Sequence, residues 1–579
     1  MAKRGRVRLA IAGLAIAMCF GGLAGCTAQA TVNVSGTAPA AASHVWITAE
    51  QIWFSTAPDT LPEATSGWIQ ATLPNPITLD LANLTPATLT QLATSLGIPS
   101  GTYLQVHLVL ADASDTLLTS AQNQGLTYNS QITVTTFDGG TGTGPLELPE
   151  PEGGLTIATN FKVVGTSTLF QNFTSNSSSD SSTTTSATST TTSTPSVDTS
   201  SAGNVILGVT IDAARDVVSY AYGTNIGYIL TPVTTAYDVS TAGGISGTLD
   251  FSALPAGTTV AVSAELPDSS QTHHAVVQRI VVNGNAGSSF TLYPLPAPSS
   301  STTNYDLVIS GAGVQTVLIR GVPVTPGTAA SAATVAQSTP IVLAPATVVY
   351  ADINGQVATP LPGGARVDFY ETVPANGELP YWIDGTAVDP ITRTLPAYNF
   401  ALSSGPLAVG AYNSGSAITF TTEDPLEREG GYVVGSSGLY RADTLNSVPS
   451  AVTGTLAVPT IVAAPVPTLP AGAFAGTLTV SFSTTSRDEY DSGFVTVSSG
   501  NRLVETAGIA ALLPGGGGTI TITNLPSGTA LVSGAGVPYQ VAVRAWNSAN
   551  PSGTITRTAG ANSLSFGNGA AGSISISLP

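Results

Sequence analysis

The chain is poor in charged residues, in histidine and above all in cysteine. Of its 579 residues, 9% are charged and four are histidine, so general bases and metal ligands are scarce. The two cysteines are Cys19 and Cys26, both close to the amino terminus, which leaves no pair for a disulfide in the rest of the chain. We therefore expect packed hydrophobic cores, without disulfides, to stabilise the protein.

Positive charge is also in short supply. A formal net charge of −18 at pH 7 repels nucleic acid and gives no electrostatic attraction to anionic lipid headgroups. The sequence lacks a G-x-S-x-G nucleophile elbow, an H-E-x-x-H zinc motif and a phosphate-binding P-loop. We therefore expect a protein that is not an enzyme, does not bind nucleic acid and needs no cofactor or metal.

Abundant glycine and proline, with many Ser, Thr and Val residues, favour strands and turns over helices. Alternating apolar residues predict strands, each of which follows a Pro-x-Gly turn. The predicted strands cover residues 101–110, 260–266 and 539–545, and the turns cover residues 98–101, 254–257 and 525–528. The best helix candidate is 85–97, which has a threonine cap, Pro86 in its first turn and Gly97 at its end. The predicted fold class is mainly β, with tandem β-sandwich modules.

Three short apolar stretches with a central glycine recur at about the size of one β-sandwich domain. They are residues 245–249, 353–357 and 452–456. We therefore predict β-sandwich modules at 241–347, 348–450 and 451–579, after a larger β-rich amino-terminal domain at 26–240. Within that domain, residues 172–203 are almost entirely Ser and Thr, which predicts a disordered loop; the alternative is a linker between two domains.

The first 25 residues have the features of an export signal. Four cationic residues precede an uncharged run from Leu9 to Gly25 that is short for a membrane span. The run ends in Leu23-Ala24-Gly25-Cys26, which resembles the lipobox of bacterial lipoproteins; an ordinary cleaved signal peptide is the alternative. The resemblance implies cleavage before Cys26, a diacylglycerol on its sulfur, and a further acyl chain such as palmitate on the new amino terminus. Thr27 in place of aspartate implies the outer membrane where an envelope has two membranes.

The order of elements in the first domain resembles a bacterial lipoprotein family, the domain of unknown function numbered 4382. The segments that carry the resemblance are Val45-Trp46-Ile47-Thr48, Gly67-Trp68-Ile69, Ile77-Thr78-Leu79-Asp80-Leu81, Ile98-Pro99-Ser100-Gly101-Thr102-Tyr103, residues 209–218 and residues 228–233. The resemblance covers roughly Ala30 to Val239. Residues 245–343 are similar to the prealbumin-like or carboxypeptidase-regulatory-like sandwich, through 289–292, 305–309 and 317–322. The modules after the first domain thus resemble prealbumin-like or immunoglobulin-like sandwiches. These likenesses imply a fold and an exported lipoprotein, and no established activity.

Several residues are candidates for binding. Tyr381 and Trp382 lie in a stretch rich in Pro, Gly and Asp, which suggests an exposed platform for stacking a sugar; burial is the alternative. His273 and His274 follow a polar stretch, where neighbouring side chains point apart and chelate one ion poorly, so a solvated loop is favoured. His107 is expected at a surface or interface, and Trp46, Trp53, Trp68 and Trp546 in a core or on a sheet face.

Two acidic clusters raise the possibility of calcium binding. The first contains Asp488, Glu489 and Asp491, and the second contains Glu423, Asp424, Glu427 and Glu429. Calcium prefers such oxygen-rich loops, but neither cluster has EF-hand spacing and each contains or adjoins an arginine. Solvated loops are therefore favoured.

These observations predict a lipid-anchored protein of the cell envelope with a noncatalytic structural or adhesive binding role. Its expected partners are the membrane, through the lipid, and an envelope protein or glycan. A glycan-binding accessory of surface polysaccharide processing is the alternative, and an unrecognised hydrolase is a third hypothesis.

Overall fold

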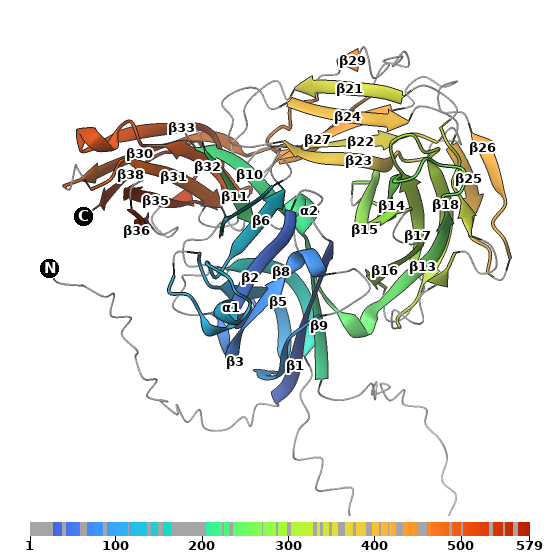
Figure 1. Ribbon diagram of the computed structural model, residues 1–579, viewed down its shortest axis with the longest axis horizontal. Helices are drawn as coiled ribbons and strands as arrows, with labels where there is room; N and C mark the ends of the chain where they lie inside the picture. The colour runs from blue at the N-terminus through green and yellow to red at the C-terminus, as the bar shows by residue number, and fades with distance from the viewer. Residues whose placement is uncertain are drawn as a thin grey trace, which may run out of the picture.

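The computed structural model shows a mainly β protein, which confirms the predicted fold class (Figure 1). It describes most of residues 27–578. Outside the described residues lie 1–26, 58–66, 164–203, 357–364, 389–396, 424–431, 448–459 and 579, together with shorter gaps between elements. The predicted signal segment, Cys26 and the Ser/Thr tract at 172–203 therefore lie outside the described residues. None of the described helices has the length and apolar character that crossing a membrane requires.

The amino-terminal domain contains a four-stranded sheet, in the order β12-β9-β1-β4, and an eight-stranded sheet. The larger sheet has the order β10-β11-β7-β6-β2-β5-β8, with β3 paired to β2. One hydrophobic cluster joins the two sheets, with Val32 and Leu207 from the smaller sheet and Ile52 and Val106 from the larger. The elements are β1 (Thr27–Thr37), β2 (Ala42–Ser55), β3 (Ile69–Asp80), η1 (Leu81–Asn83), β4 (Thr90–Pro99), β5 (Gly101–Leu110), α1 (Thr119–Asn123), β6 (Gln131–Thr135), β7 (Thr141–Glu147), β8 (Leu155–Val163), β9 (Asn204–Asp212), α2 (Ala213–Asp216), β10 (Val217–Tyr222), β11 (Asn225–Leu230), β12 (Thr235–Asp238) and η2 (Val239–Thr241).

The predicted helix at 85–97 is wrong for the described part of that segment. Residues from Thr90 onward form β4, which pairs antiparallel with β1, and Leu96 lies opposite Ala30. Leu92, Leu96 and Ile98 are buried in the core of the domain. The four-residue spacing of Leu92 and Leu96 suits one face of a helix and of a strand alike, so pairing with the distant β1 determines the outcome.

Three sandwiches with one topology follow the amino-terminal domain. In each, the first strand pairs antiparallel with the fourth and parallel with the last. The second strand pairs with the third and with a strand that follows the fourth, which is β17 in module A, β27 in module B and β35 in module C. Module A comprises β13 (Ala242–Asp250), β14 (Thr259–Pro267), β15 (His274–Asn283), β16 (Ser289–Pro296), β17 (Thr303–Ser310), β18 (Val317–Val324), β19 (Ala333–Thr334) and β20 (Ile341–Val342). The shared topology supports three repeats of one β-sandwich unit.

Modules B and C repeat the pattern with additions. Module B comprises β21 (Tyr350–Gln356), β22 (Ala365–Glu371), β23 (Tyr381–Val388), β24 (Ala397–Ser403), β27 (Tyr432–Gly438), β28 (Arg441–Ser447) and β29 (Thr460–Ile461), and it also carries the hairpin β25 (Leu407–Ala411) and β26 (Phe420–Glu423). Module C comprises β30 (Phe474–Thr484), β31 (Ser492–Ser499), β32 (Arg502–Gly508), η5 (Leu513–Gly515), β33 (Gly517–Ser527), β34 (Val537–Pro538), β35 (Gln540–Asn547), β36 (Asn550–Ala559), β37 (Ser565–Phe566) and β38 (Ala571–Leu578). Alternating burial along β30 is typical of a strand with one face in a core.

The recurring glycine marks the first strand of each sandwich. Gly247 lies in β13 and Gly355 in β21, whereas residue 454 lies outside the described residues. In module C the first strand is β30, where Gly476 pairs with Leu525 of β33. A Cβ atom at Gly247 would lie 2.6 Å from the ring of Phe290, so a side chain there has no room. The predicted repeat at 452–456 lies outside the described residues and stays a prediction.

Buried tyrosines secure three of the proline-containing corners. The hydroxyl of Tyr103 donates to the carbonyl of Pro99, that of Tyr305 to Pro296, and that of Tyr539 to Pro526, at 2.6 to 2.8 Å. Each ring lies in a hydrophobic core, so the hydroxyl needs a partner there. These bonds fix how the chain leaves the corner and enters the next strand.

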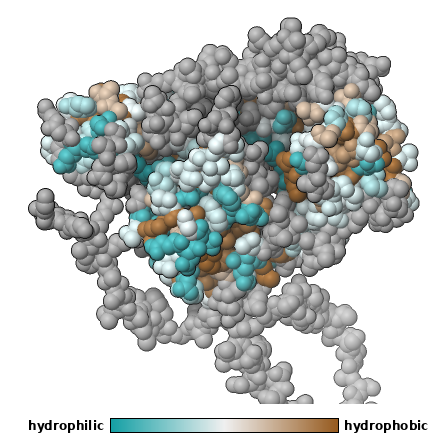
Figure 2. Space-filling model, viewed as in Figure 1, coloured by the Kyte–Doolittle hydropathy of each residue, from teal (hydrophilic) through white to brown (hydrophobic). Residues whose placement is uncertain are grey.

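The modules lie around the amino-terminal domain (Figure 1). Module A lies to its right, module B above, and module C to the upper left, beside β10 and β11. On the face seen in Figure 2, hydrophobic and hydrophilic residues are interleaved over the described parts of the amino-terminal domain and module A.

Candidate functional site

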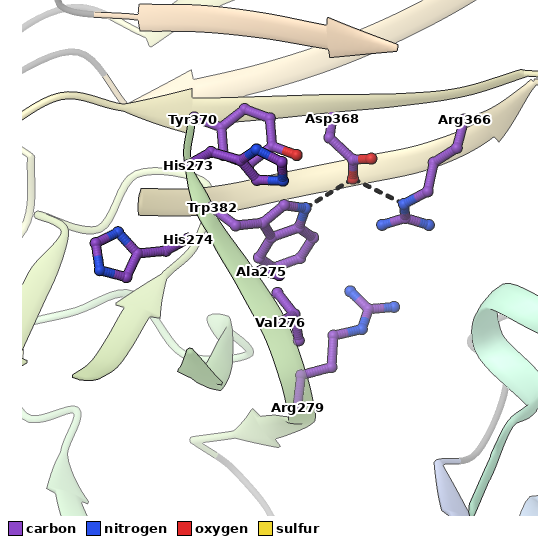
Figure 3. Close-up of a pocket in the computed structure, with 9 residues that line it drawn as sticks. All are labelled: His273, His274, Ala275, Val276, Arg279, Arg366, Asp368, Tyr370 and Trp382. Carbon is purple, nitrogen blue, oxygen red and sulfur yellow. Dashed lines mark hydrogen bonds and ion pairs between the residues drawn. The ribbon is translucent and has the colours of Figure 1, made fainter. Parts of the chain in front are cut away.

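A pocket of about 170 Å³ lies where module A meets module B (Figure 3). Its walls come from the start of β15, from alternate residues of β22, and from β23. The lining residues are His273, His274, Ala275, Val276, Arg279, Arg366, Asp368, Tyr370 and Trp382. Alternation along β22 places Arg366, Asp368 and Tyr370 on one face, because successive strand residues point to opposite sides.

Trp382 is the central side chain of this pocket, and 3% of its surface is exposed. Its indole N–H donates to Asp368 at 2.7 Å, and the guanidinium of Arg279 lies 5.5 Å from the centre of its ring. Its backbone N–H donates at 3.0 Å to the carboxyl of Glu265 at the end of β14. Trp382 therefore connects the two modules as well as lining the pocket.

Two arginines and two acids are concentrated here. The Nε atom of Arg366 lies 2.8 Å from Asp368. Burial raises the pKa of Asp384, against the opposing effect of Arg279 and Arg366. Gly385 lies opposite Asp368 in the sheet, and a Cβ atom there would collide with the Asp368 carboxylate and the Arg366 guanidinium. The absence of a side chain at Gly385 thus makes room for this ion pair.

Tyr381 and Trp382 do not form the exposed platform that the sequence suggested. Both are buried, and as neighbours on a strand they face different surroundings. The Tyr381 hydroxyl donates to Asp306 of module A at 2.9 Å, and its ring stacks on His274 at 3.9 Å. Of the two residues, only Trp382 lines the pocket. A role of the pair in ligand binding stays a prediction.

His273 and His274 are buried, so the prediction of a solvated loop is wrong for their side chains. The ring of His273 meets Tyr370 edge to face at 4.8 Å, whereas His274 packs on Tyr381. Burial lowers the pKa of His274, partly offset by Asp306, whose carboxylate lies 3.6 Å away. Docking of module B covers both rings, and the sequence around them carries no sign of it.

The turn before these histidines is capped by an acid. Burial acts to raise the pKa of Asp268, but hydrogen bonds from Ser270, His273 and Thr272 outweigh it and hold the pKa well below its usual range. The carboxylate therefore stays ionised and fixes the turn that leads into β15. His273 is positioned by this turn.

Two buried glutamates lie at the same interface. Burial raises the pKa of Glu265 to about 8, against hydrogen bonds from Ser263 and Trp382. Burial likewise raises the pKa of Glu371 to about 8, and the hydroxyl of Thr316 only partly offsets this. Neither carboxyl oxygen of Glu371 makes a well-formed hydrogen bond to a described residue. Both carboxyl groups are therefore mainly protonated at neutral pH. Burying the neutral form costs less free energy than burying the charged form.

The other predicted candidates lie apart from this pocket. The predicted place of His107 at a surface or interface is wrong, because the residue is buried beside Trp53 and Trp68, at ring distances of 5.2 and 5.7 Å. Burial lowers its pKa to about 4. Trp46, Trp53, Trp68 and Trp546 are half-buried, as a place on a sheet face predicts. Glu489 and Asp491 are exposed, whereas Asp488 and residues 424–429 lie outside the described residues. Within the described part of the chain, no three His, Cys, Asp or Glu side chains gather closely enough to hold a metal ion.

The amino-terminal domain has a recognisable counterpart among protein families. Residues 27–232 match Domain of unknown function (DUF4382). The match runs from β1 to just beyond β11, so the predicted resemblance is confirmed. The DUF4382 region contributes no residue to the lining of the pocket, which comes entirely from modules A and B.

Solved structures resemble the chain only distantly. The Bacillus anthracis TIE protein shares 10% identity, over 94% of this chain and 73% of its own, with a TM-score of 0.14. A streptococcal ancillary pilin shares 10% identity, over 57% of this chain and 98% of its own, with a TM-score of 0.12. These scores are too low to support an argument about fold or function. No curated protein matches the chain.

Proposed function

We propose that the protein is a noncatalytic structural or adhesive binding protein of the cell envelope, anchored by a lipid on Cys26. The observation that carries this proposal is a sheet shared by two sandwiches. The β25–β26 hairpin of module B extends the sheet of module A, with Val317–Arg320 of β18 parallel to Ala408–Ala411 of β25. Separating the modules would break these backbone pairs and expose Phe420, which packs on the module A core. A body joined in this way suits load bearing and the presentation of a binding surface.

Contacts of arginine side chains join the remaining parts. The guanidinium of Arg441 in β28 donates to the carbonyls of Pro467 and Asn524, at 3.3 and 3.1 Å. Arg544 in β35 of module C contacts Asp112 and Glu147 of the DUF4382 domain. The last module thus returns to the first domain, which supports a single rigid body.

The lipid anchor is tested by two matched cysteine substitutions. Cys26→Ser should leave a soluble or unprocessed protein, because the substitution removes the sulfur that would carry the diacylglycerol. Without acyl chains, the proposed membrane anchor is lost. Cys19→Ser, inside the apolar run, should mature and fractionate with membranes like the wild type. Normal maturation and membrane fractionation of Cys26→Ser would contradict the proposed anchor.

The binding role is tested by recovering envelope partners of the acylated protein. We expect a saturable envelope protein or glycan partner that is retained without being altered. A glycan-binding accessory role is the second candidate, favoured by the small pocket between modules A and B, whose lining includes Arg279 and Arg366. A hydrolase would instead release soluble products from isolated envelopes, and that release would contradict both proposals.

A further inference from the structure

We propose that the pocket between modules A and B binds a single carboxylate group, carried by an acidic sugar residue or by a small organic acid. This proposal deepens the binding role proposed above and rests on it only for its biological setting. The proposal arises from the juxtaposition of Arg279 and Arg366, which reach the pocket from different modules (Figure 3).

The charge of the lining points to an anion. The whole chain has 16 Lys and Arg against 34 Asp and Glu, yet two arginines and one acid line this pocket. Counted over Arg279, Arg366 and Asp368, the lining carries one net positive charge. That balance matches one carboxylate better than a phosphate group, which carries a charge of about −1.5 to −2 at pH 7.

Both guanidinium groups are held in place by their surroundings. The ring of Trp382 lies beneath Arg279, and Asp368 holds both the Trp382 indole and the Nε atom of Arg366. A guanidinium has five N–H donors in a rigid fork that matches a carboxylate, so it can keep one contact while binding another group. Because Arg279 covers the indole face, the role of Trp382 is to orient the cation and not to stack a sugar.

The size of the pocket limits what enters it. Sites for drug-sized ligands usually have volumes of about 300–1,000 Å³. At about 170 Å³, this pocket takes one small group or one residue of a longer chain. A second pocket of about 220 Å³ shares Arg279 and is lined by Asp384, so Asp384 lies close enough to compete with a bound anion for that arginine.

Calorimetric titration of the full chain with glucuronate and glucuronamide tests the proposal without any mutation. The two probes differ in the charge of one group. We expect glucuronate to bind and glucuronamide to bind at least about tenfold more weakly, because a charge-assisted hydrogen bond contributes more than a neutral one. Acetate binding as tightly as glucuronate would identify a small organic acid as the source, and weaker acetate binding would identify the sugar. Equal binding of glucuronamide, tighter binding of inorganic phosphate, or no binding of either carboxylate would overturn the proposal.

Substitutions on the two sides of Arg279 should act in opposite directions. Arg279→Gln should weaken glucuronate binding by about ten- to hundredfold. Asp384→Asn should strengthen it, since the competing acid is removed. Arg320→Gln is the matched control, because Arg320 pairs with Glu378 away from the pocket and should leave the affinity unchanged. Unaltered binding in both Arg279→Gln and Asp384→Asn would place the ligand elsewhere. Retention on envelopes without glucuronate binding would overturn this proposal and leave the proposed function intact.

Discussion

Replacing Arg544 should release module C from the DUF4382 domain. Its guanidinium donates to Glu147 and lies 3.5 Å from Asp112, and the three side chains are 12 to 15% exposed. Burial raises the pKa of Glu147, and Arg544 opposes that effect. In Arg544→Gln, two carboxylates would remain largely buried without their cation.

The magnitude follows from the cost of leaving a buried charge unpaired. Removing one partner of a buried pair costs about 3–5 kcal/mol, which corresponds to a loss of about two to three and a half orders of magnitude in the docking equilibrium. Protonation of Glu147 relieves part of this cost, so the loss should be smaller at pH 5 than at pH 8. Arg544→Gln combined with Glu147→Gln should dock better than Arg544→Gln alone, because one of the two carboxylates left without Arg544 is removed.

Hydrogen exchange and small-angle X-ray scattering measure this docking. We expect faster exchange at the docking contact in 141–147 and a larger radius of gyration in Arg544→Gln, with Arg320→Gln behaving like the wild type. Unchanged exchange and an unchanged radius in Arg544→Gln would refute the reasoning, since the ion pair would then contribute nothing to holding the last module.

Three further predictions address the interface and the cores. Burial raises the folded pKa of Glu265 to about 8, so the contribution of this group to stability is complete below pH 4.5 and is lost as the pH rises through about 8. Glu265→Gln should therefore flatten the fall in melting temperature between pH 5 and 9. An unchanged fall would show that other groups cause the pH dependence. Tyr305→Phe and Tyr539→Phe should each cost about 1–3 kcal/mol in chemical denaturation, because a buried carbonyl loses its donor; a loss below a few tenths would contradict this. The fragment 464–579 should fold alone with cooperative melting, since its core uses only residues of module C; a broad, noncooperative transition would show that it depends on its neighbours.

Strands and corners could be predicted because their signals are local. Alternation at 101–110, 260–266 and 539–545 corresponds to β5, β14 and β35, and proline with glycine marks the turns before or between strands. Leu92 and Leu96 show the limit of such signals, because a spacing of four residues fits one face of a helix and of a strand equally well. Only pairing with β1 decides between them.

The pocket could not be predicted because its residues meet only when two modules dock. Arg279 and Arg366 are separated by most of a module in the sequence, and no spacing rule connects them. Tyr381 and Trp382 are aromatic residues in a polar stretch, but in the fold they contact Asp306 and Glu265 of another module. Local composition does not report such contacts.

The most direct test of the binding role is incubation of the acylated protein with isolated cell envelopes, with the bound protein and the soluble products measured together over time. We expect saturable retention of the protein and no release of soluble fragments. Release that grows with time and enzyme-like turnover would contradict a noncatalytic role, and the absence of retention would contradict a binding role.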